Sequence, residues 1–333
     1  MELEREITEA RAAGDRDRLA ELLVGRADEQ VRARHLDDAR RLLDEAAGLH
    51  GDAGRRVDEA RCLCFSAELC RATGKLELAE SRAGRAERIA PPGSAPSVSA
   101  AAELGELALM RQRFDDAADA FARALQAGSA AGLVGAAEAA LARKRAQALA
   151  AHTTCAEIVD LLARAAALYR DAQMPAEARK TRVEQATALE ALGRATELAE
   201  LENDLRAEAE AAGDDSVLAD LALLDAARHI TAGATDEALD DAERARRHAL
   251  EGVHPVAYVS AAIAIAELCE ARGDRVRAYE VLAVGWATLG DLLGEAAAKA
   301  TFAPRLEAQR ERWGDDAFAA ARDAYYAQRG QPA

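Results

Sequence analysis

A period of about forty residues runs through most of this chain. A small or apolar residue recurs just inside the expected second helix of seven successive helical hairpins, at intervals of 38 to 41 residues: Ala39, Ala79, Ala117, Ile158, Leu198, Ala238 and Ala278. Repeats of this length are typical of stacked helix pairs, because each pair buries its apolar face only against its neighbours. The period predicts an all-α solenoid.

Two further columns of small residues have the same period. Twelve residues before each marker stand Ala27, Ala67, Gly105, Ala146, Ala186, Ala226 and Ala266. Seven residues after each marker stand Ala46, Ala86, Ala124, Ala165, Leu205, Ala245 and Gly285, of which only the leucine is large. Helix axes approach to about 8–10 Å only where the residues at the crossing are small. We therefore expect these columns where neighbouring helices cross.

Glycines mark the expected end of the first helix in four repeats. Gly74, Gly193, Gly233 and Gly273 each stand five residues before a marker. A helix commonly ends in a left-handed residue, a conformation that glycine adopts without steric cost. The other three repeats have Arg34, Gln112 and Thr153 at this position.

The segment from Phe114 to Leu125 (FDDAADAFARAL) resembles the second helix of a tetratricopeptide repeat (TPR). The resemblance covers roughly residues 16–292, and it is to long-repeat modules of bacterial regulators, because the usual TPR period is about 34 residues. It implies a right-handed α-solenoid of about seven antiparallel hairpins with helical caps. Phe121 fills a large aromatic site of the family. At the same position in three other repeats this chain has Ala83, Glu202 and Ala242.

The expected organisation has four parts. Residues 1–15 hold an N-terminal helix, 16–292 the repeats, 293–328 a helical cap with a helix from about Pro304, and 329–333 a tail containing Pro332. The repeats are expected at 16–50, 51–90, 97–128, 130–172, 174–212, 214–251 and 254–292. Pro175, Pro255 and Pro304 are expected to begin helices, where a missing N–H is tolerated.

The expected cap is rich in aromatic residues, which are scarce elsewhere in the chain. It contains Trp313, Phe318, Tyr325 and Tyr326. Such a cluster is expected to seal the core of the last hairpin, and a dimer contact is the alternative. The oligomeric state therefore stays open.

Charge and hydropathy narrow the classes of partner. The formal net charge of −16 and the pI near 5.0 argue against nucleic acid as a main ligand. No run of about 18 apolar residues is present, and no signal-peptide pattern opens the chain, so we expect a cytoplasmic protein without a membrane partner. The five cysteines are expected to be reduced thiols. The preference for Ala and Arg suggests a high-GC bacterial genome.

Catalytic and metal-binding motifs are not found in the sequence. Cys62 and Cys64 would point about 200° apart on a helix, so we interpret them as small buried side chains. His248 and His254 flank an expected turn without a partnering cysteine. Acid pairs such as Asp115 and Asp116 stand at expected helix starts, where carboxylates cap free N–H groups. We expect neither enzyme activity nor a cofactor nor a metal site.

A candidate partner-binding groove follows from the TPR resemblance, in which the first helix of each hairpin lines the concave face. Ten residues are expected to face it: Arg61, Arg71, Glu106, Arg143, Gln147, Lys180, Thr187, Leu223, Ile230 and Glu267. The only asparagine, Asn203, is expected on a second helix, so asparagine clamps for a peptide backbone or a terminal carboxylate are not expected. A folded partner, a helix laid in the groove, or contact along the outer face remain open.

These observations predict a non-enzymatic interaction scaffold or adaptor for a protein or peptide partner. The alternative is a regulator that senses a small molecule or a peptide and acts on a separate effector chain. A third hypothesis is an accessory protein whose groove shelters an enzyme. The sequence does not name the partner, the ligand or the pathway.

Overall fold

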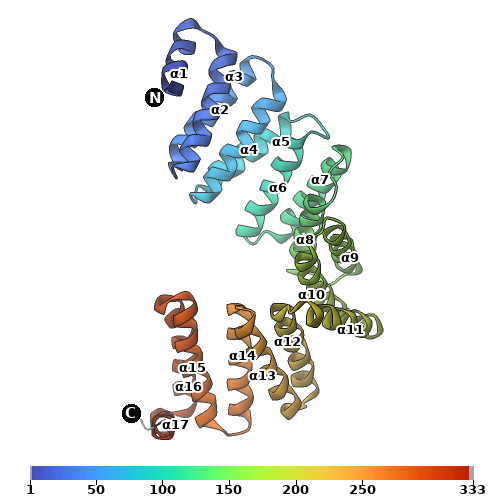
Figure 1. The fold of residues 1–333 in the computed structure, drawn as a ribbon, viewed down its shortest axis with the longest axis vertical. Coiled ribbons are helices and arrows are strands. Elements are labelled where there is room, and N and C mark those ends of the chain that lie inside the picture. Colours follow the sequence, from blue (N-terminus) through green and yellow to red (C-terminus); the bar gives the residue numbers. More distant parts are fainter. Residues whose placement is uncertain (1, 330–333) are drawn as a thin grey trace. The chain divides into compact units, whose positions relative to one another are not determined.

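The computed structural model describes residues 2–329, and this range contains seventeen α-helices and no strand (Figure 1). The all-α prediction is confirmed. The first nine helices are α1 (Glu2–Ala13), α2 (Arg16–Arg32), α3 (Leu36–Asp52), α4 (Arg56–Ala72), α5 (Leu76–Ile89), α6 (Ala95–Met110), α7 (Phe114–Ala130), α8 (Ala136–Ala150) and α9 (Ala156–Asp171). They are followed by α10 (Pro175–Ala191), α11 (Ala195–Ala212), α12 (Asp215–Ala232), α13 (Thr235–Glu251), α14 (Pro255–Ala271), α15 (Arg275–Leu293), α16 (Glu295–Trp313) and α17 (Asp315–Gln328). Pro332 lies outside the described residues.

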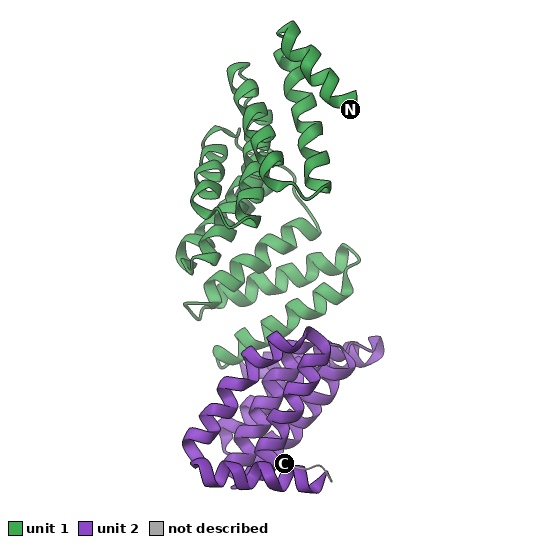
Figure 2. Cartoon of the chain, turned by 90° about the vertical axis from the view of Figure 1, so that its left-hand side faces the viewer, with its two compact units in different colours: residues 1–193 green, residues 194–333 purple. Residues whose placement is uncertain are grey.

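The helices form two compact units (Figure 2). Unit 1 spans Met1–Gly193 with α1 to α10, and unit 2 spans Arg194–Ala333 with α11 to α17. Within each unit, successive helices pack against one another in sequence order. The division falls inside the fifth expected repeat, between α10 and α11.

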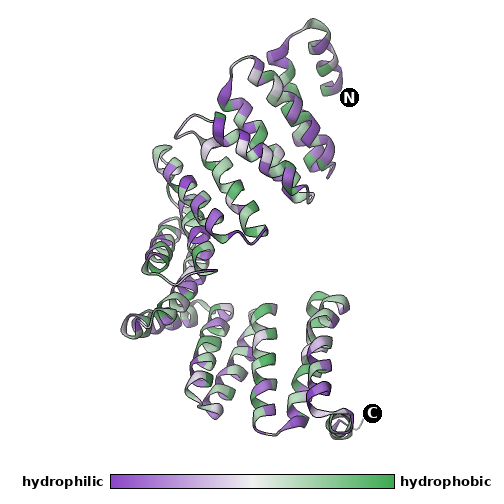
Figure 3. Cartoon of the chain, turned by 180° about the vertical axis from the view of Figure 1, so that it is seen from behind, coloured by the Kyte–Doolittle hydropathy of each residue, from purple (hydrophilic) through white to green (hydrophobic). Residues whose placement is uncertain are grey.

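Hydrophobic and hydrophilic residues are both present along the helices (Figure 3). All residues of the three sequence columns are buried, so the small residues lie inside the helix stack. Gly105 shows why they are small: a Cβ atom there would lie 2.7 Å from the ring of Phe121. Gly285 stands in the same relation to Phe302, at 2.8 Å. None of the described helices is both long and apolar enough to cross a bilayer.

The residue five positions before each marker ends the first helix in a left-handed conformation in every repeat except the fourth. Gly74, Gly193, Gly233 and Gly273 are left-handed, with φ between 68° and 80°. Arg34 and Gln112 adopt the same conformation without being glycine, with φ of 60° and 56°. The fourth hairpin differs, because residues 151–155 form a longer connection and Thr153 is not left-handed.

The C-terminal cap differs from the expectation of one helix beginning near Pro304. Two helices, α16 and α17, are present, and Pro304 lies inside α16. Proline removes one helical hydrogen bond, to the carbonyl of Ala300. Both Pro304 and Ala300 are exposed, so water can satisfy that carbonyl.

The aromatic residues of the cap pack against α15. Tyr279 of α15 meets Phe318 and Tyr325 of α17 with ring centroids 5.4 Å and 5.6 Å apart. Tyr325 is only 5% exposed, and Trp313 and Tyr326 pack against the same cluster. The cluster therefore covers the end of the last long hairpin within one chain.

Candidate functional site

Four first helices of the unit 1 hairpins, α4, α6, α8 and α10, carry the face that we call the first-helix face. Charged side chains join neighbouring helices across it. Arg71 of α4 donates through Nε to Glu103 of α6 at 2.7 Å, and Lys144 of α8 pairs with Glu106 of α6. Burial raises the pKa of the Glu103 carboxyl, and Arg71 opposes this shift. These pairs act as links between hairpins.

The same pattern continues from α8 to α10. Arg143 of α8 donates to Glu184 of α10 at 2.6 Å and to Glu177 at 3.1 Å. Burial works against the charged guanidinium, but the hydrogen bond and charge of Glu184 outweigh it, so the pKa of Arg143 is raised. Gln147, one helical turn further along, donates through Nε2 to both oxygens of Glu184 at 3.0 Å and 3.1 Å.

A pocket of about 480 Å³ opens beside this cluster, between α8, α9 and α10. We call it the α8–α10 pocket. Ile158 and Leu162 of α9 contribute buried apolar side chains, and Gln147, Glu184 and Thr187 contribute polar ones. Its other lining residues are Ala146, Ala150, Ala151, Thr153, Thr154, Cys155, Ala188 and Ala191. The pocket therefore suits an apolar side chain of a ligand with polar groups at its edge.

Cys155 differs from the other cysteines. Cys62, Cys64, Cys70 and Cys269 are buried, whereas Cys155 is partly exposed and lines the α8–α10 pocket. Burial raises the pKa of the Cys62 thiol to about 11 and that of Cys64 to about 12. At neutral pH these two thiols stay protonated, which suits their interpretation as small buried side chains. Cys155 is therefore a thiol inside the pocket that an alkylating reagent can test for accessibility.

The structure brings only some of the ten expected groove residues together. Gln147 and Thr187 line the α8–α10 pocket. Arg71, Glu106 and Arg143 are engaged in pairs between helices.

The other two unit 1 residues lie elsewhere on the first-helix face. Lys180 is exposed and lies 3.5 Å from Glu177. Arg61 pairs with Asp58 and lines a separate pocket of about 470 Å³ between α4 and α6.

The three expected groove residues of unit 2 have different surroundings. Leu223 is half-buried and packs against a buried cluster containing Tyr258. Ile230 is 48% exposed. Glu267 lines a small pocket of about 70 Å³ with residues of α14, α15 and α16.

Sequence reasoning missed the contribution of α9 and of the 151–155 connection to the pocket. Ile158 stood in the marker column as a packing residue only. Two signals pointed to the longer connection: Thr153 replaces the turn glycine, and the preceding marker interval is the longest, at 41 residues.

The two histidines near the α13–α14 turn have acidic partners. His248 Nδ1 lies 2.8 Å from Asp215 Oδ1, and His254 Nε2 lies 3.3 Å from Asp220 Oδ1. Glu251 joins Asp215 and His248 in a group whose ligand atoms lie within 4.8 Å of one another. Direct contact between imidazole and carboxylate accounts for this cluster without an ion.

No family model and no curated protein matches the sequence. Solved structures do resemble the fold. The apo form of the quorum sensor NprR from B. thuringiensis is 14% identical, with a TM-score of 0.58 over 92% of this chain and 83% of that one. NprR in complex with its cognate peptide NprX is 15% identical, with a TM-score of 0.50 over 89% and 85% of the two chains.

Two further structures have related folds. A signal transduction ATPase with numerous domains and a tetratricopeptide repeat sensor, from Pyrococcus horikoshii, is 14% identical, with a TM-score of 0.58 over 86% of this chain and 44% of that one. Aspartyl phosphate phosphatase F from Bacillus subtilis is 14% identical, with a TM-score of 0.52 over 88% and 75%. These likenesses show a TPR-like helical solenoid fold.

Proposed function

We propose that this chain is a non-enzymatic interaction scaffold that binds a segment of a partner protein on the first-helix face of unit 1. The α8–α10 pocket carries the proposal, because it joins buried Ile158 and Leu162 to a hydrogen-bonding edge at Gln147 and Glu184. An apolar anchor of the partner would enter the pocket. Buried anchors of this kind supply most of the affinity in many interfaces.

The paired charges around the pocket limit the role of electrostatics in this proposal. Arg143 and Glu184 already neutralise one another. A charged group of the partner that replaced either residue in this pair would add little binding free energy. Apolar contact and hydrogen bonds with Gln147 and Thr187 would therefore supply most of the affinity. An amphipathic helix laid along α8 and α10 meets these requirements. We place this activity in the cytoplasm, where thiols such as Cys155 stay reduced.

The alternative is a ligand- or peptide-sensing regulator that acts on a separate effector chain. NprR, described as a quorum sensor and solved with its cognate peptide, supports this version. A phosphatase is also among the similar folds. We propose no catalytic role for this chain. Its acid pairs in α3 and α7 stand in the first helical turn and form no side-chain cap hydrogen bond, so the positive end of the helix dipole, and not capping, explains them.

Affinity capture tests the pocket when it is combined with a blocking variant. Ala150 is exposed and lines the pocket, so Ala150→Trp should fill it and abolish capture of the partner. Ala12→Trp, at an exposed position of α1, is the matched control and should capture normally. Bound partner should also protect Cys155 from alkylation. Equal capture by Ala150→Trp would place the partner elsewhere.

Thermal melting separates the two versions of the proposal. Stabilisation by several degrees with one peptide or metabolite, lost in Ala150→Trp, would favour the sensor. Captured protein without any stabilising small ligand would favour the scaffold.

A further inference from the structure

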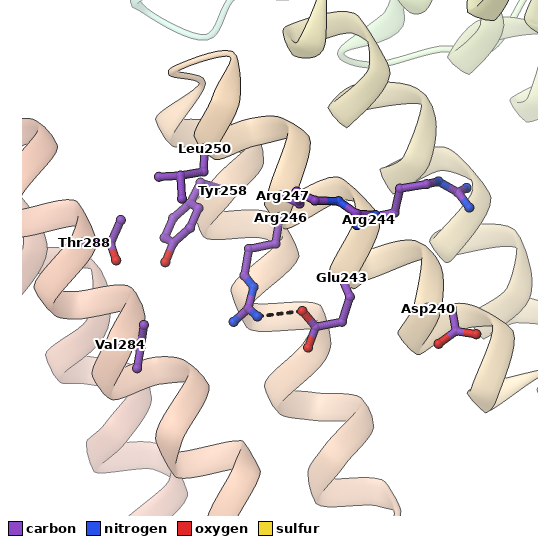
Figure 4. Close-up of a pocket in the computed structure, with 9 residues that line it drawn as sticks. All are labelled: Asp240, Glu243, Arg244, Arg246, Arg247, Leu250, Tyr258, Val284 and Thr288. Carbon is purple, nitrogen blue, oxygen red and sulfur yellow. Dashed lines mark hydrogen bonds and ion pairs between the residues drawn. The ribbon is translucent and has the colours of Figure 1, made fainter. Parts of the chain in front are cut away.

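A further cavity lies in unit 2, on the side formed by second helices. It has a volume of about 730 Å³ and lies between α13 and α15, with Tyr258 of α14 beneath (Figure 4). Leu250 of α13 and Val284 of α15 are its apolar side chains, and Thr288 of α15 contributes a hydroxyl. The charged side chains that line it all come from α13: Asp240, Glu243, Arg244, Arg246 and Arg247. Its size is in the range of small-molecule sites, about 300–1,000 Å³.

Tyr258 is the most informative of these residues. The residue as a whole is 3% exposed, and its side chain lines the cavity. Figure 4 shows the hydroxyl pointing into the space between Arg246 and Thr288. The hydroxyl of a largely buried tyrosine usually forms a hydrogen bond. An acceptor atom of a ligand in this space would satisfy it.

Arg246 is one of three arginines that line the cavity, and it lies beside the Tyr258 hydroxyl (Figure 4). Its Nη2 donates to Glu243 at 2.6 Å, and Glu243 also accepts from Arg277 of α15 at 2.8 Å. One carboxylate therefore serves two guanidinium groups, and the exposed Arg247 of α13 also lines the cavity. The remaining N–H groups of Arg246 have no partner among the described residues. A guanidinium group matches the planar geometry of a carboxylate.

We propose that this cavity binds an organic carboxylate with an apolar body. The carboxylate accepts hydrogen bonds from Arg246 and from the Tyr258 hydroxyl, and the apolar body contacts Leu250 and Val284. Leu250 is 49% exposed, so it has apolar surface to cover. This site is in another unit than the α8–α10 pocket and does not depend on the function proposed for that pocket.

The ligand has two sources, a free organic acid and the C-terminus of a peptide. Isothermal titration calorimetry on the full chain with phenylbutyrate and with a short peptide ending in leucine distinguishes them. Each probe is compared with its primary amide, which keeps the shape and removes the charge. Binding of phenylbutyrate alone assigns a free acid, and binding of the peptide alone assigns a C-terminus. In either case the amide should bind at least about tenfold more weakly.

Two variants connect the binding to the named residues. Arg246→Gln should lower the affinity for the carboxylate by about tenfold, and Tyr258→Phe should lower it by about fivefold. Neither variant should change the melting temperature. Arg26→Gln is the matched control, because Arg26 also donates to a glutamate three residues away at 2.6 Å and is similarly exposed. It should bind like the wild type. The proposal is overturned if neither carboxylate binds, if the amides bind equally well, or if Arg246→Gln keeps full affinity.

Discussion

Two glycines within helices have opposite relations to their surroundings. Gly105 of α6 is buried against the ring of Phe121, where an added Cβ would lie 2.7 Å away. Gly25 of α2 is exposed and has nothing within 4 Å of such an atom. The first glycine is required by packing, whereas the second only weakens its helix.

Alanine substitution should therefore have opposite effects at these positions. Gly105→Ala is expected to lower the free energy of unfolding by about 1–3 kcal/mol, because the ring of Phe121 must shift. Gly25→Ala is expected to raise it by about 0.5–1 kcal/mol, because alanine is the better helix former. Urea denaturation followed by circular dichroism measures both. A Gly105→Ala protein as stable as the wild type would show that the crossing of α6 and α7 has spare room.

At the scale of helices, the first-helix face of unit 1 is held together by ion pairs whose strength depends on pH. Glu103 of α6 is 4% exposed, and burial raises its pKa above the ordinary value of 4.5. The folded chain therefore keeps this proton to a higher pH than the unfolded chain does. The contribution of Glu103 to stability falls as the pH rises from about 4.5 through the folded pKa.

Removing the partner of Glu103 should make this dependence steeper. Arg71→Gln is expected to cost about 2 kcal/mol at pH 7, because it leaves a buried charge uncompensated, and Arg71 itself is partly exposed. The cost should shrink as the pH falls and Glu103 takes up a proton. Arg61→Gln, on the same helix but with an exposed pair, should change stability by less than about 0.5 kcal/mol. Urea titrations at pH 7 and pH 5 test this, and an equal loss at both values would contradict it.

At the scale of the whole molecule, a repeat array needs a terminal element that covers its last apolar face. Helix α17 does this through Phe318 and Tyr325, which meet Tyr279 of α15. The same aromatic residues were the basis for the alternative of a dimer contact. Sealing of the core and dimer contact differ in how shortening one of these side chains changes the stability of the single chain.

Tyr325→Ala is expected to lower the free energy of unfolding by about 3 kcal/mol, because it opens a cavity between α15 and α17. Tyr325→Phe keeps the ring and should have a much smaller effect. Denaturation combined with analytical ultracentrifugation is the measurement. Dissociation of a dimer by Tyr325→Ala without loss of chain stability would instead assign the cluster to a dimer contact.

The sequence alone determined the helix pairs and the sites of their crossings. Each repeat carries the same information locally: small residues such as Ala67 and Gly105 where helices cross, and glycines such as Gly74 where a first helix ends. Helix periodicity and turn conformation depend on residues close together in the chain, so a repeated pattern predicts them.

Only the tertiary structure decided which expected groove residues are engaged with one another. Arg71 meets Glu103 and Arg143 meets Glu184 across 32 and 41 residues of sequence, and no local pattern specifies such partners. The α8–α10 pocket and the position of Pro304 inside α16 were likewise set by packing. Both depend on how much space neighbouring helices leave and on which backbone groups still reach water, and these properties arise only once the helices are stacked.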